Sequence, residues 1–212
     1  MIVLHYTAMV DAEAALARLC DPGAEVSAHY LIARDGRLFQ MVEEGARAWH
    51  AGAGQWGAVC DVNSRSIGIE LDNDGAQPFS QPLMQTLEGL LPGIMARWGI
   101  GAPRVIAHSD MAPGRKSDPG RRFDWRRLAR QGLSIWPDPD VAPADPTPPD
   151  EAMFRVATAR IGYGADWPTA DVLEALRQRF RPWAHGPLGA EDMALARTLA
   201  RRFPVDAPPA SS

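Results

Sequence analysis

The chain has 212 residues, with 22 lysines and arginines against 26 aspartates and glutamates and a formal net charge of −4. This mildly acidic balance and the lack of a basic block argue against nucleic-acid binding, which depends on contacts to phosphates. Cys20 and Cys60 are the only cysteines, too few for a disulfide scaffold or a thiolate zinc cluster, although a single bridge between them stays open.

The start of the chain predicts a soluble, cytoplasmic protein. Residues 1–7 lack the basic start and the long apolar run of a signal peptide, and no apolar stretch reaches the ~18 residues of a membrane span. A core strand is nevertheless expected from residue 2 onward. If an upstream leader precedes it, the periplasm or envelope is the alternative compartment.

The first elements are a strand and a helix. Residues 2–6 form a continuous run of β-formers, which predicts a buried strand that brings His5 to its end. Asp11 is expected to cap a helix over residues 12–19, where alanines and leucines recur at helical spacing.

A tight hairpin is the strongest local signal. Two apolar runs, residues 27–34 and 37–42, flank Asp35-Gly36, a pair that suits the positive φ of a tight hairpin turn. His29 lies in the first strand of this hairpin. The glycines of residues 49–54 then predict a loop, in which His50 either binds substrate or anchors the loop through its ring nitrogens.

The strand at residues 66–71 alternates with a period of two. Ile67, Ile69 and Leu71 face apolar packing, while Gly68 and Glu70 face the opposite side. Because a glycine clears space next to a carboxylate on that face, we expect a group to approach it closely.

A long helix and a histidine-bearing strand follow. Ser80 is expected to cap a helix that ends near residues 98–101, with Pro92 kinking it. The chain then returns through a strand at residues 104–107 that delivers His108 to its end. A loop rich in proline and glycine presents Lys116 and Asp118.

The remaining chain divides into segments by composition. Residues 136–149 hold six prolines and few apolar side chains, which predicts a stiff linker at 136–150 between a first domain, 1–135, and a small module, 151–205. The module is expected to contain three helices, at residues 151–161, 169–180 and 190–202. Residues 206–212 form a predicted disordered tail.

His108 and Asp118 are of the residue types that ligate zinc, and a catalytic zinc needs three protein ligands and one open position. The candidates for the third ligand are His5, His29 and His50. We prefer His5 because it ends a strand as His108 does, and adjacent strands can present both imidazoles at one edge of a sheet.

Five motifs occur in order along the chain, namely Val-Leu-His-Tyr-Thr around His5, Ser-Ala-His-Tyr-Leu-Ile, Ala-Trp-His-Ala-Gly, Ser-Ile-Gly-Ile-Glu, and His108-x7-Lys-x-Asp-Pro-Gly. Together they resemble the type-2 zinc amidase family, the N-acetylmuramoyl-L-alanine amidases of peptidoglycan recycling and cell-wall lysis. The resemblance covers residues 1–130. It implies an α/β fold with a mixed central sheet flanked by helices, followed here by the small three-helix domain.

The resemblance also implies the site. His5, His108 and Asp118 match the ligands of Zn²⁺. Glu70 matches the carboxylate that moves the proton of the metal-bound water, and Lys116 the cation that stabilises the oxyanion. His29 and His50 match positions that are not ligands in the family.

The implied reaction is hydrolysis of the amide between N-acetylmuramic acid, in its ordinary or 1,6-anhydro form, and L-alanine of the stem peptide. The implied partners are muropeptides or the sacculus. One rival is a non-catalytic peptidoglycan-binding protein with a structural zinc, but such a site would need neither Glu70 nor Lys116. Another is a zinc amidase for a different acylated peptide. The C-terminal module resembles a peptidoglycan-binding-like domain, and whether it binds glycan or only packs is left open.

Overall fold

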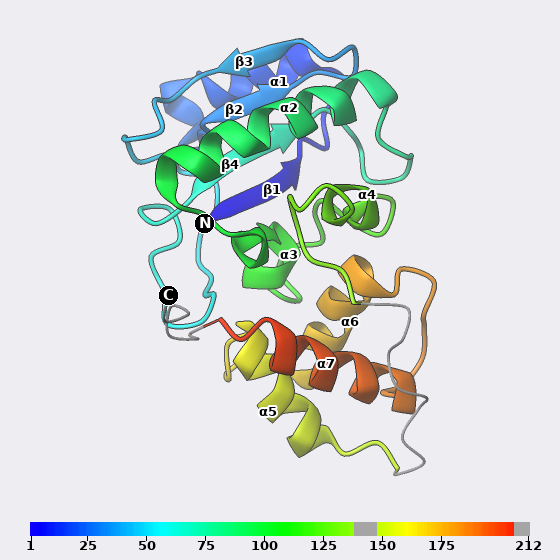
Figure 1. Cartoon of the computed structure of the whole chain (residues 1–212). Coiled ribbons are helices and arrows are strands. Elements are labelled where there is room, and N and C mark those ends of the chain that lie inside the picture. Colours follow the sequence, from blue (N-terminus) through cyan, green and yellow to red (C-terminus); the bar gives the residue numbers. More distant parts are fainter. Residues whose placement is uncertain (138–147, 206–212) are drawn as a thin grey trace.

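The computed structural model describes residues 1–137 and 148–205 (Figure 1). The described residues form a five-stranded sheet in the order β3-β2-β4-β1-β5. The strands are β1 (Ile2–Tyr6), β2 (Tyr30–Ile32), β3 (Leu38–Gln40), β4 (Ile67–Leu71) and β5 (Val105–Ala107). Only β2 and β3 pair antiparallel, and the other neighbours are parallel. The sheet is therefore mixed, as predicted.

The alternation of side chains sorts the sheet into two faces. On one face, Ile2, Leu4 and the apolar residues of β4 pack against α2 (Gln81–Trp98). On the other face, Leu31 packs against α1 (Ala12–Leu19), and Val3 belongs to a core that includes side chains of the C-terminal helices. Because His5 and Glu70 follow the alternation of Val3 and Gly68, they lie on this second face.

The predicted turn and helix signals are found at their expected places. The backbone N–H of Ala14 donates to Asp11 at 2.8 Å, which caps α1. The N–H of Leu83 donates to the Ser80 hydroxyl at the start of α2, and Gly99 ends that helix with φ +59°. Pro92 lies inside α2, which continues through it as one helix. Gly36 has φ +92° in the hairpin turn.

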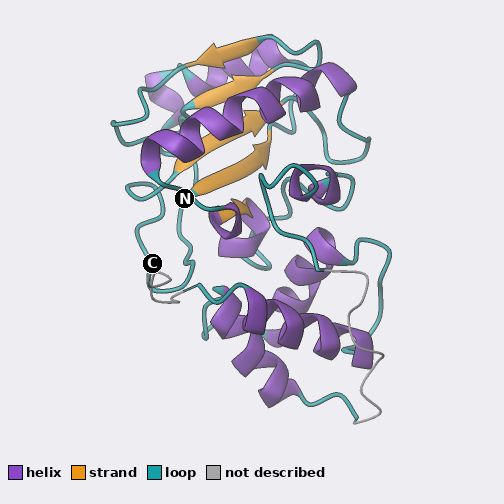
Figure 2. Ribbon diagram, in the orientation of Figure 1, coloured by secondary structure: helices purple, strands orange, loops and turns teal. Residues whose placement is uncertain are grey.

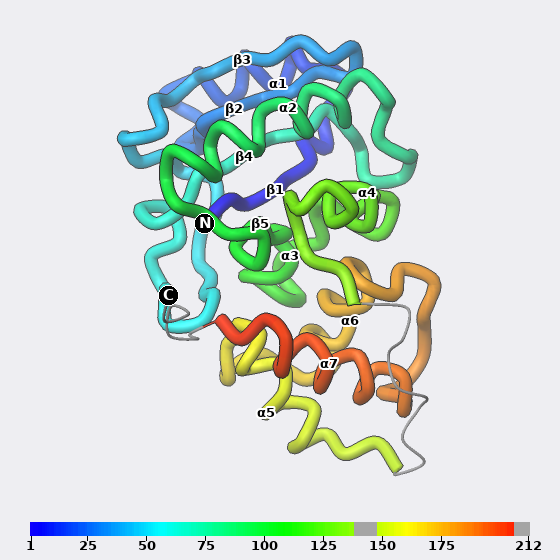
Figure 3. The backbone as a smooth tube through the Cα atoms, viewed as in Figure 1, coloured from blue at the N-terminus to red at the C-terminus, as the bar shows by residue number. Residues whose placement is uncertain are grey.

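The structure contains short helical segments that sequence reasoning did not predict. They are the 3₁₀ turns η1 (Pro22–Ala24) and η2 (Ala102–Arg104) and the one-turn helix α3 (His108–Met111). The expected loop after β5 thus begins with a helical turn, α3 (Figure 3). His108 is the first residue of this turn. A further short helix, α4 (Trp125–Ala129), packs on the α2 face through Trp125 and Leu128.

The C-terminal helices are α5 (Glu151–Ile161), α6 (Thr169–Phe180) and α7 (Ala190–Arg202), as predicted (Figure 2). They share one continuous apolar core with the sheet. That core joins Val3 of β1, Ile106 of β5 and Met111 of α3 to apolar side chains of all three helices, such as Phe154, Val172, Leu176 and Leu199. The three helices therefore form one packed body with the sheet.

Two sequence predictions lie outside the described residues: the tail at 206–212, and positions 138–147 of the linker. At the start of the predicted linker, Trp136 packs against Phe180, with ring centroids 6.1 Å apart. Cys20 and Cys60 are exposed and unbridged. Across residues 1–137 and 148–205, none of the helices has the length and apolar character needed to cross a membrane.

Candidate metal centre and active site

The parallel pairing of three strands brings the candidate side chains to one edge of the sheet. β1 lies between β4 and β5 and runs parallel to both. In this register His5 lies beside Glu70, and His108 directly follows the end of β5. The two imidazoles and the carboxylate of Glu70 are therefore gathered by the backbone alone.

His5, His108 and Asp118 form a compact buried group. His5 Nδ1 lies 2.8 Å from His108 Nδ1, and Asp118 Oδ2 lies 3.1 Å from the first nitrogen and 3.0 Å from the second. The backbone N–H of Ser109 donates to the carbonyl of Asp118 at 3.0 Å and thereby joins the two ends of the loop that carries His108 and Asp118. One atom from each of the three side chains thus points to a common centre.

The other ring nitrogens have partners that fix where the protons lie. His108 Nε2 is 3.0 Å from the carbonyl of Ala51, which can only accept, so this nitrogen carries the proton. The hydroxyl of Ser66 donates to the carbonyl of Val62 and therefore accepts from His50 Nε2, at 3.2 Å.

It follows that His50 Nδ1 is unprotonated and accepts from His5 Nε2, 3.0 Å away. The two nitrogens that face Asp118, Nδ1 of His5 and Nδ1 of His108, are then both unprotonated and present lone pairs to it. Three acceptors without a shared proton repel one another, and a cation at their centre would relieve the repulsion.

The charges of these groups fit a metal site at neutral pH. Burial, followed by repulsion from His108, lowers the pKa of His5 to about 4. Two neutral imidazoles and one carboxylate are ordinary ligands for zinc, and three protein ligands leave a fourth position open, as in catalytic sites.

Glu70 lies beside this centre with an unused acceptor. Its Oε2 is buried and has no hydrogen-bond partner among the described residues. Burial, and next the negative charge of Asp118, raise the pKa of Glu70 well above its ordinary value, although Lys116 opposes the shift. A carboxyl group of this kind can exchange a proton with a bound molecule.

The site opens into a cleft of about 370 Å³, a size that suits a small ligand. Helix α1 forms one wall, and the segment from Arg115 to Asp118 forms another. Lys116 lies on this second wall, so the cleft brings all five predicted site residues together. Trp49 lines the rim with about half of its surface exposed, and the Arg47 guanidinium lies 4.2 Å from its ring centroid.

The chain is similar to several characterised proteins. The model of the N-acetylmuramoyl-L-alanine amidase family matches residues 1–121. The N-acetylmuramoyl-L-alanine amidase AmiD of Escherichia coli is 37% identical over 97% of this chain and 84% of AmiD. The chain belongs to the N-acetylmuramoyl-L-alanine amidase family. It is a hydrolase of the amidase class, and its mixed sheet flanked by helices is the fold of that family.

Solved structures extend this likeness over nearly the whole amidase. AmiD in complex with the substrate anhydro-N-acetylmuramic acid-L-Ala-D-γ-Glu-L-Lys covers 96% of this chain and 89% of its own, with a TM-score of 0.88. AmpDh3 of Pseudomonas aeruginosa in complex with anhydromuramic pentapeptide has a TM-score of 0.87 at 31% identity and covers 97% of this chain and 92% of its own. The C-terminal helices therefore fall within the matched region.

A third relative matches about half of the chain. The 1,6-anhydro-N-acetylmuramyl-L-alanine amidase AmpD of Haemophilus influenzae is 43% identical over 48% of this chain and 56% of its own length.

Sequence analysis left two roles open for His50 of this amidase, and the contacts of the ring favour the anchoring one. The ring is buried beside His5, both of its nitrogens have partners within the protein, and a Cβ at Gly68 would lie 2.3 Å from it. The close approach predicted from Gly68 is therefore that of a protein side chain. Asn63 holds this part of the chain, because its Oδ1 accepts the backbone N–H groups of His50 and Ala51.

His29 is a structural residue of the amidase. Its Nδ1 accepts from the backbone N–H of Gly68 at 3.0 Å, and its Nε2 donates to the carbonyl of Ala46 at 3.1 Å. Both ring nitrogens are occupied within the protein, and the ring lies beside His50, with centroids 5.7 Å apart. His29 thus lies outside the group of candidate ligands, in agreement with the preference for His5.

Proposed function

We propose that this amidase hydrolyses the amide between N-acetylmuramic acid and L-alanine of the stem peptide, with Zn²⁺ held by His5 Nδ1, His108 Nδ1 and a carboxylate oxygen of Asp118. The observation that carries the proposal is the convergence of two unprotonated imidazole nitrogens and one carboxylate oxygen. Each imidazole carries its proton on its other nitrogen. The family of the chain supplies the class of the scissile bond.

Zinc in such a site lowers the pKa of a coordinated water to about 7 and polarises a carbonyl, so that hydrolysis runs at neutral pH. The residues of the chain provide the remaining steps. Glu70, beside His5, accepts the proton of the attacking water and then delivers it to the departing amine of L-alanine. Its raised pKa favours this return of the proton.

Lys116 is the cation proposed for the developing negative charge on the carbonyl oxygen. It lines the same cleft as Glu70 and the three ligands. A donor in this role contributes most when charge develops on the substrate, and loss of one such donor typically lowers the rate by about 10²–10³.

For the substrate, we favour soluble 1,6-anhydro-muropeptides over the intact sacculus. The complexes of AmiD and AmpDh3 contain anhydromuramyl peptides, and these two proteins match nearly the whole chain. The cleft is large enough for a small ligand. A role in muropeptide recycling follows from this preference, and the cytoplasmic location stays a prediction.

The test is mass spectrometry of the products from anhydromuramyl tripeptide, reduced muramyl tripeptide and intact sacculi, each with and without a chelator. Release of free stem peptide that the chelator abolishes and added zinc restores is the expected result. The preferred substrate then separates recycling from wall lysis. If zinc-loaded protein bound muropeptides but cleaved none of the three, the non-catalytic binding protein would replace the amidase.

A further inference from the structure

The segment that carries two of the proposed ligands, residues 108–121, is here called the metal loop. His108 begins it and Asp118 lies near its end. The helices α5, α6 and α7, with the segments between them, are here called the C-terminal unit. We propose that helix α6 of this unit is a positioning element of the metal site, in which Arg179 holds the beginning of the metal loop and Glu174 holds its end. This inference rests on the metal role proposed above for His108 and Asp118.

The first anchor is a fully buried ion pair between Arg179 and Asp110. Arg179 Nη1 lies 2.6 Å from Asp110 Oδ2, and the two side chains are 1% and 0% exposed. Arg179 Nη2 also donates to the carbonyl of Val105 in β5, at 2.8 Å. One guanidinium from α6 therefore holds both the strand that leads to His108 and the helical turn that His108 begins.

Asp110 connects Arg179 to the backbone next to His108. Its Oδ2 accepts the N–H of Ala107 at 2.9 Å, and its Oδ1 accepts the hydroxyl of Tyr163 at 2.7 Å. Burial, and next the charge of Asp110, raise the pKa of Tyr163 well above its ordinary value, so the hydroxyl remains a donor. The C-terminal unit thus supplies two donors to the carboxylate that fixes the first turn of α3.

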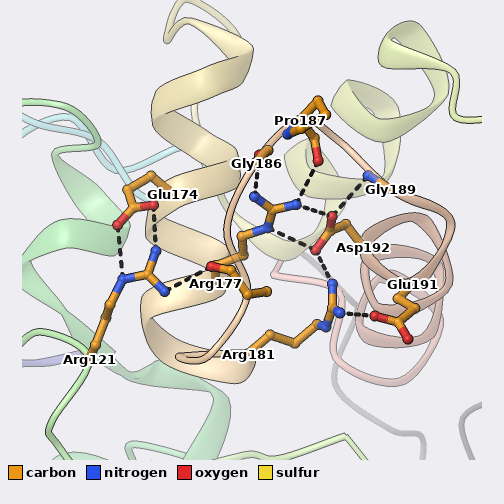
Figure 4. A network of polar contacts seen from close by, with 10 residues as sticks. Arg121, Glu174, Arg177, Arg181, Gly186, Pro187, Gly189, Glu191 and Asp192 are labelled. Carbon is orange, nitrogen blue, oxygen red and sulfur yellow. Dashed lines mark hydrogen bonds and ion pairs between the residues drawn. The ribbon is translucent and has the colours of Figure 1, made fainter.

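The second anchor lies three residues after Asp118. Arg121 Nη2 lies 2.6 Å from Glu174 of α6 (Figure 4). Arg121 Nη1 also donates to the carbonyls of Pro182 and Ala184, at 2.8 and 3.1 Å. These contacts tie the exit of the metal loop to α6 and to the segment that follows it.

The middle of the metal loop lies directly against the same helix. Gly114 has φ +73°, and a Cβ there would lie 2.4 Å from Asp171 Oδ2. Met111 and Ala112 share an apolar core with Val172 and Leu176 of α6. The helix therefore contacts the loop at its beginning, middle and end, as expected of an element that determines the shape of the loop.

The same helix offers a matched control. Arg177 forms a buried ion pair with Asp192 at 2.5 Å, with side chains 5% and 1% exposed, and its other partners are the carbonyls of Gly186 and Pro187 (Figure 4). All these partners belong to the C-terminal unit. Arg177 and Arg179 share the same helix, burial and charge, but only Arg179 has an ion-pair partner on the metal loop.

The experiment compares Arg179→Met with Arg177→Met in the full chain. Zinc affinity is measured by competition with a chelator, and the midpoint of thermal unfolding is measured on the metal-free protein. Both variants are expected to unfold at lower temperature. Only Arg179→Met is expected to bind zinc more weakly, by about tenfold or more. Losses of this size are typical when a residue outside the ligand set that keeps the ligands in position is removed.

Milder variants keep the test decisive if a methionine variant does not fold. Tyr163→Phe removes one donor to Asp110 and retains the ring, and Arg179→Lys retains the charge. Both are expected to weaken zinc binding less than Arg179→Met does, and the visible spectrum of the cobalt-substituted protein should change in Arg179→Lys but not in Arg177→Lys. Equal zinc affinities in the Arg177 and Arg179 variants would overturn the proposal.

The exit anchor has its own pair of variants. Glu174→Ala removes the partner of Arg121, whereas Glu191→Ala removes an exposed partner of Arg181 within the C-terminal unit. Only Glu174→Ala should weaken zinc binding, and identical affinities would refute the role of Glu174. His108→Ala serves as the reference: if it kept zinc, the metal assignment itself would fail, whereas loss of zinc there with no effect at Arg179 refutes only the role of α6.

Discussion

His50 Nδ1 lies 3.0 Å from His5 Nε2, directly behind the imidazole whose other nitrogen faces Asp118. The hydrogen bond continues through His50 Nε2 to the hydroxyl of Ser66. This chain fixes the tautomer and the ring orientation of a proposed zinc ligand, which is the usual task of groups that contact ligands from the side away from the metal.

The first prediction concerns His50. His50→Leu removes the acceptor for His5 Nε2 and should weaken zinc binding by about 10–100-fold. His50→Gln can still present an oxygen to that nitrogen and should recover part of the loss. Zinc competition titrations on both variants measure the effect. Wild-type affinity in His50→Leu would show that the tautomer of His5 needs no such support.

The second prediction concerns the metal itself. Asp118→Asn removes the one negative charge among the three proposed ligands and should abolish stoichiometric zinc and activity together. Asp124→Asn is the control, since Asp124 only caps α4 through the N–H of Arg127. Metal content by elemental analysis decides the matter, and a full equivalent of zinc in Asp118→Asn would remove Asp118 from the ligand set.

The third prediction separates proton transfer from metal binding. Glu70→Gln keeps the shape of the side chain and should retain zinc, yet lose about 10²–10⁴-fold in turnover because it can no longer accept a proton. Single-turnover hydrolysis of anhydromuramyl tripeptide, with metal content measured on the same sample, tests this. An active Glu70→Gln enzyme would move the proton transfer to another group.

Local patterns account for much of the fold and of the site. The run at residues 2–6 and the strand before His108 both read as buried strands, and parallel pairing of β1 with β5 places their ends together. The alternation at residues 66–71 puts Glu70 on the face opposite the α2 core. These features depend on side-chain period and strand direction, which the sequence displays directly.

The remaining features depend on contacts between distant parts of the chain. Nothing near Asp110 indicates that Arg179 will neutralise it, and the group that fills the space above Gly68 could have been a substrate instead of His50. Likewise, the proline-rich composition predicts a linker but does not indicate which residues the helices after it contact. The apolar stripes of these helices were predicted, but the core that they share with Val3 was not.

The fourth prediction uses the space above Gly68. In Gly68→Ala the new methyl group would lie 2.3 Å from the ring of His50, so the ring or the strand must shift. Overpacking of this kind typically costs about 1–3 kcal/mol in the free energy of unfolding. Gly45→Ala is the control, because a Cβ there meets nothing within 4 Å. Urea unfolding should show a loss only at Gly68, and equal stability of the two variants would contradict the packing argument.

The last prediction concerns pH and Glu44, which joins the hairpin to the end of α2. Glu44 accepts hydrogen bonds from Tyr30 at 2.7 Å and from Trp98 at 2.6 Å, and its Oε1 lies 2.5 Å from Arg97. The bonds from Arg97, which outweigh the effect of burial, lower the pKa of Glu44 from 4.5 to about 2.

Because the folded pKa lies below the unfolded one, the stabilisation by Glu44 is complete above pH ~4.5 and is lost as the pH falls toward ~2. Glu44→Gln should therefore lower the free energy of unfolding by about 2 kcal/mol at neutral pH, less than the full pKa shift would give, because solvent around the exposed Arg97 screens the ion pair. Urea unfolding of both proteins at pH ~7 and ~3 measures the difference, which should shrink at the lower pH. A difference that stayed constant would mean that the charge of Glu44 does not stabilise the fold.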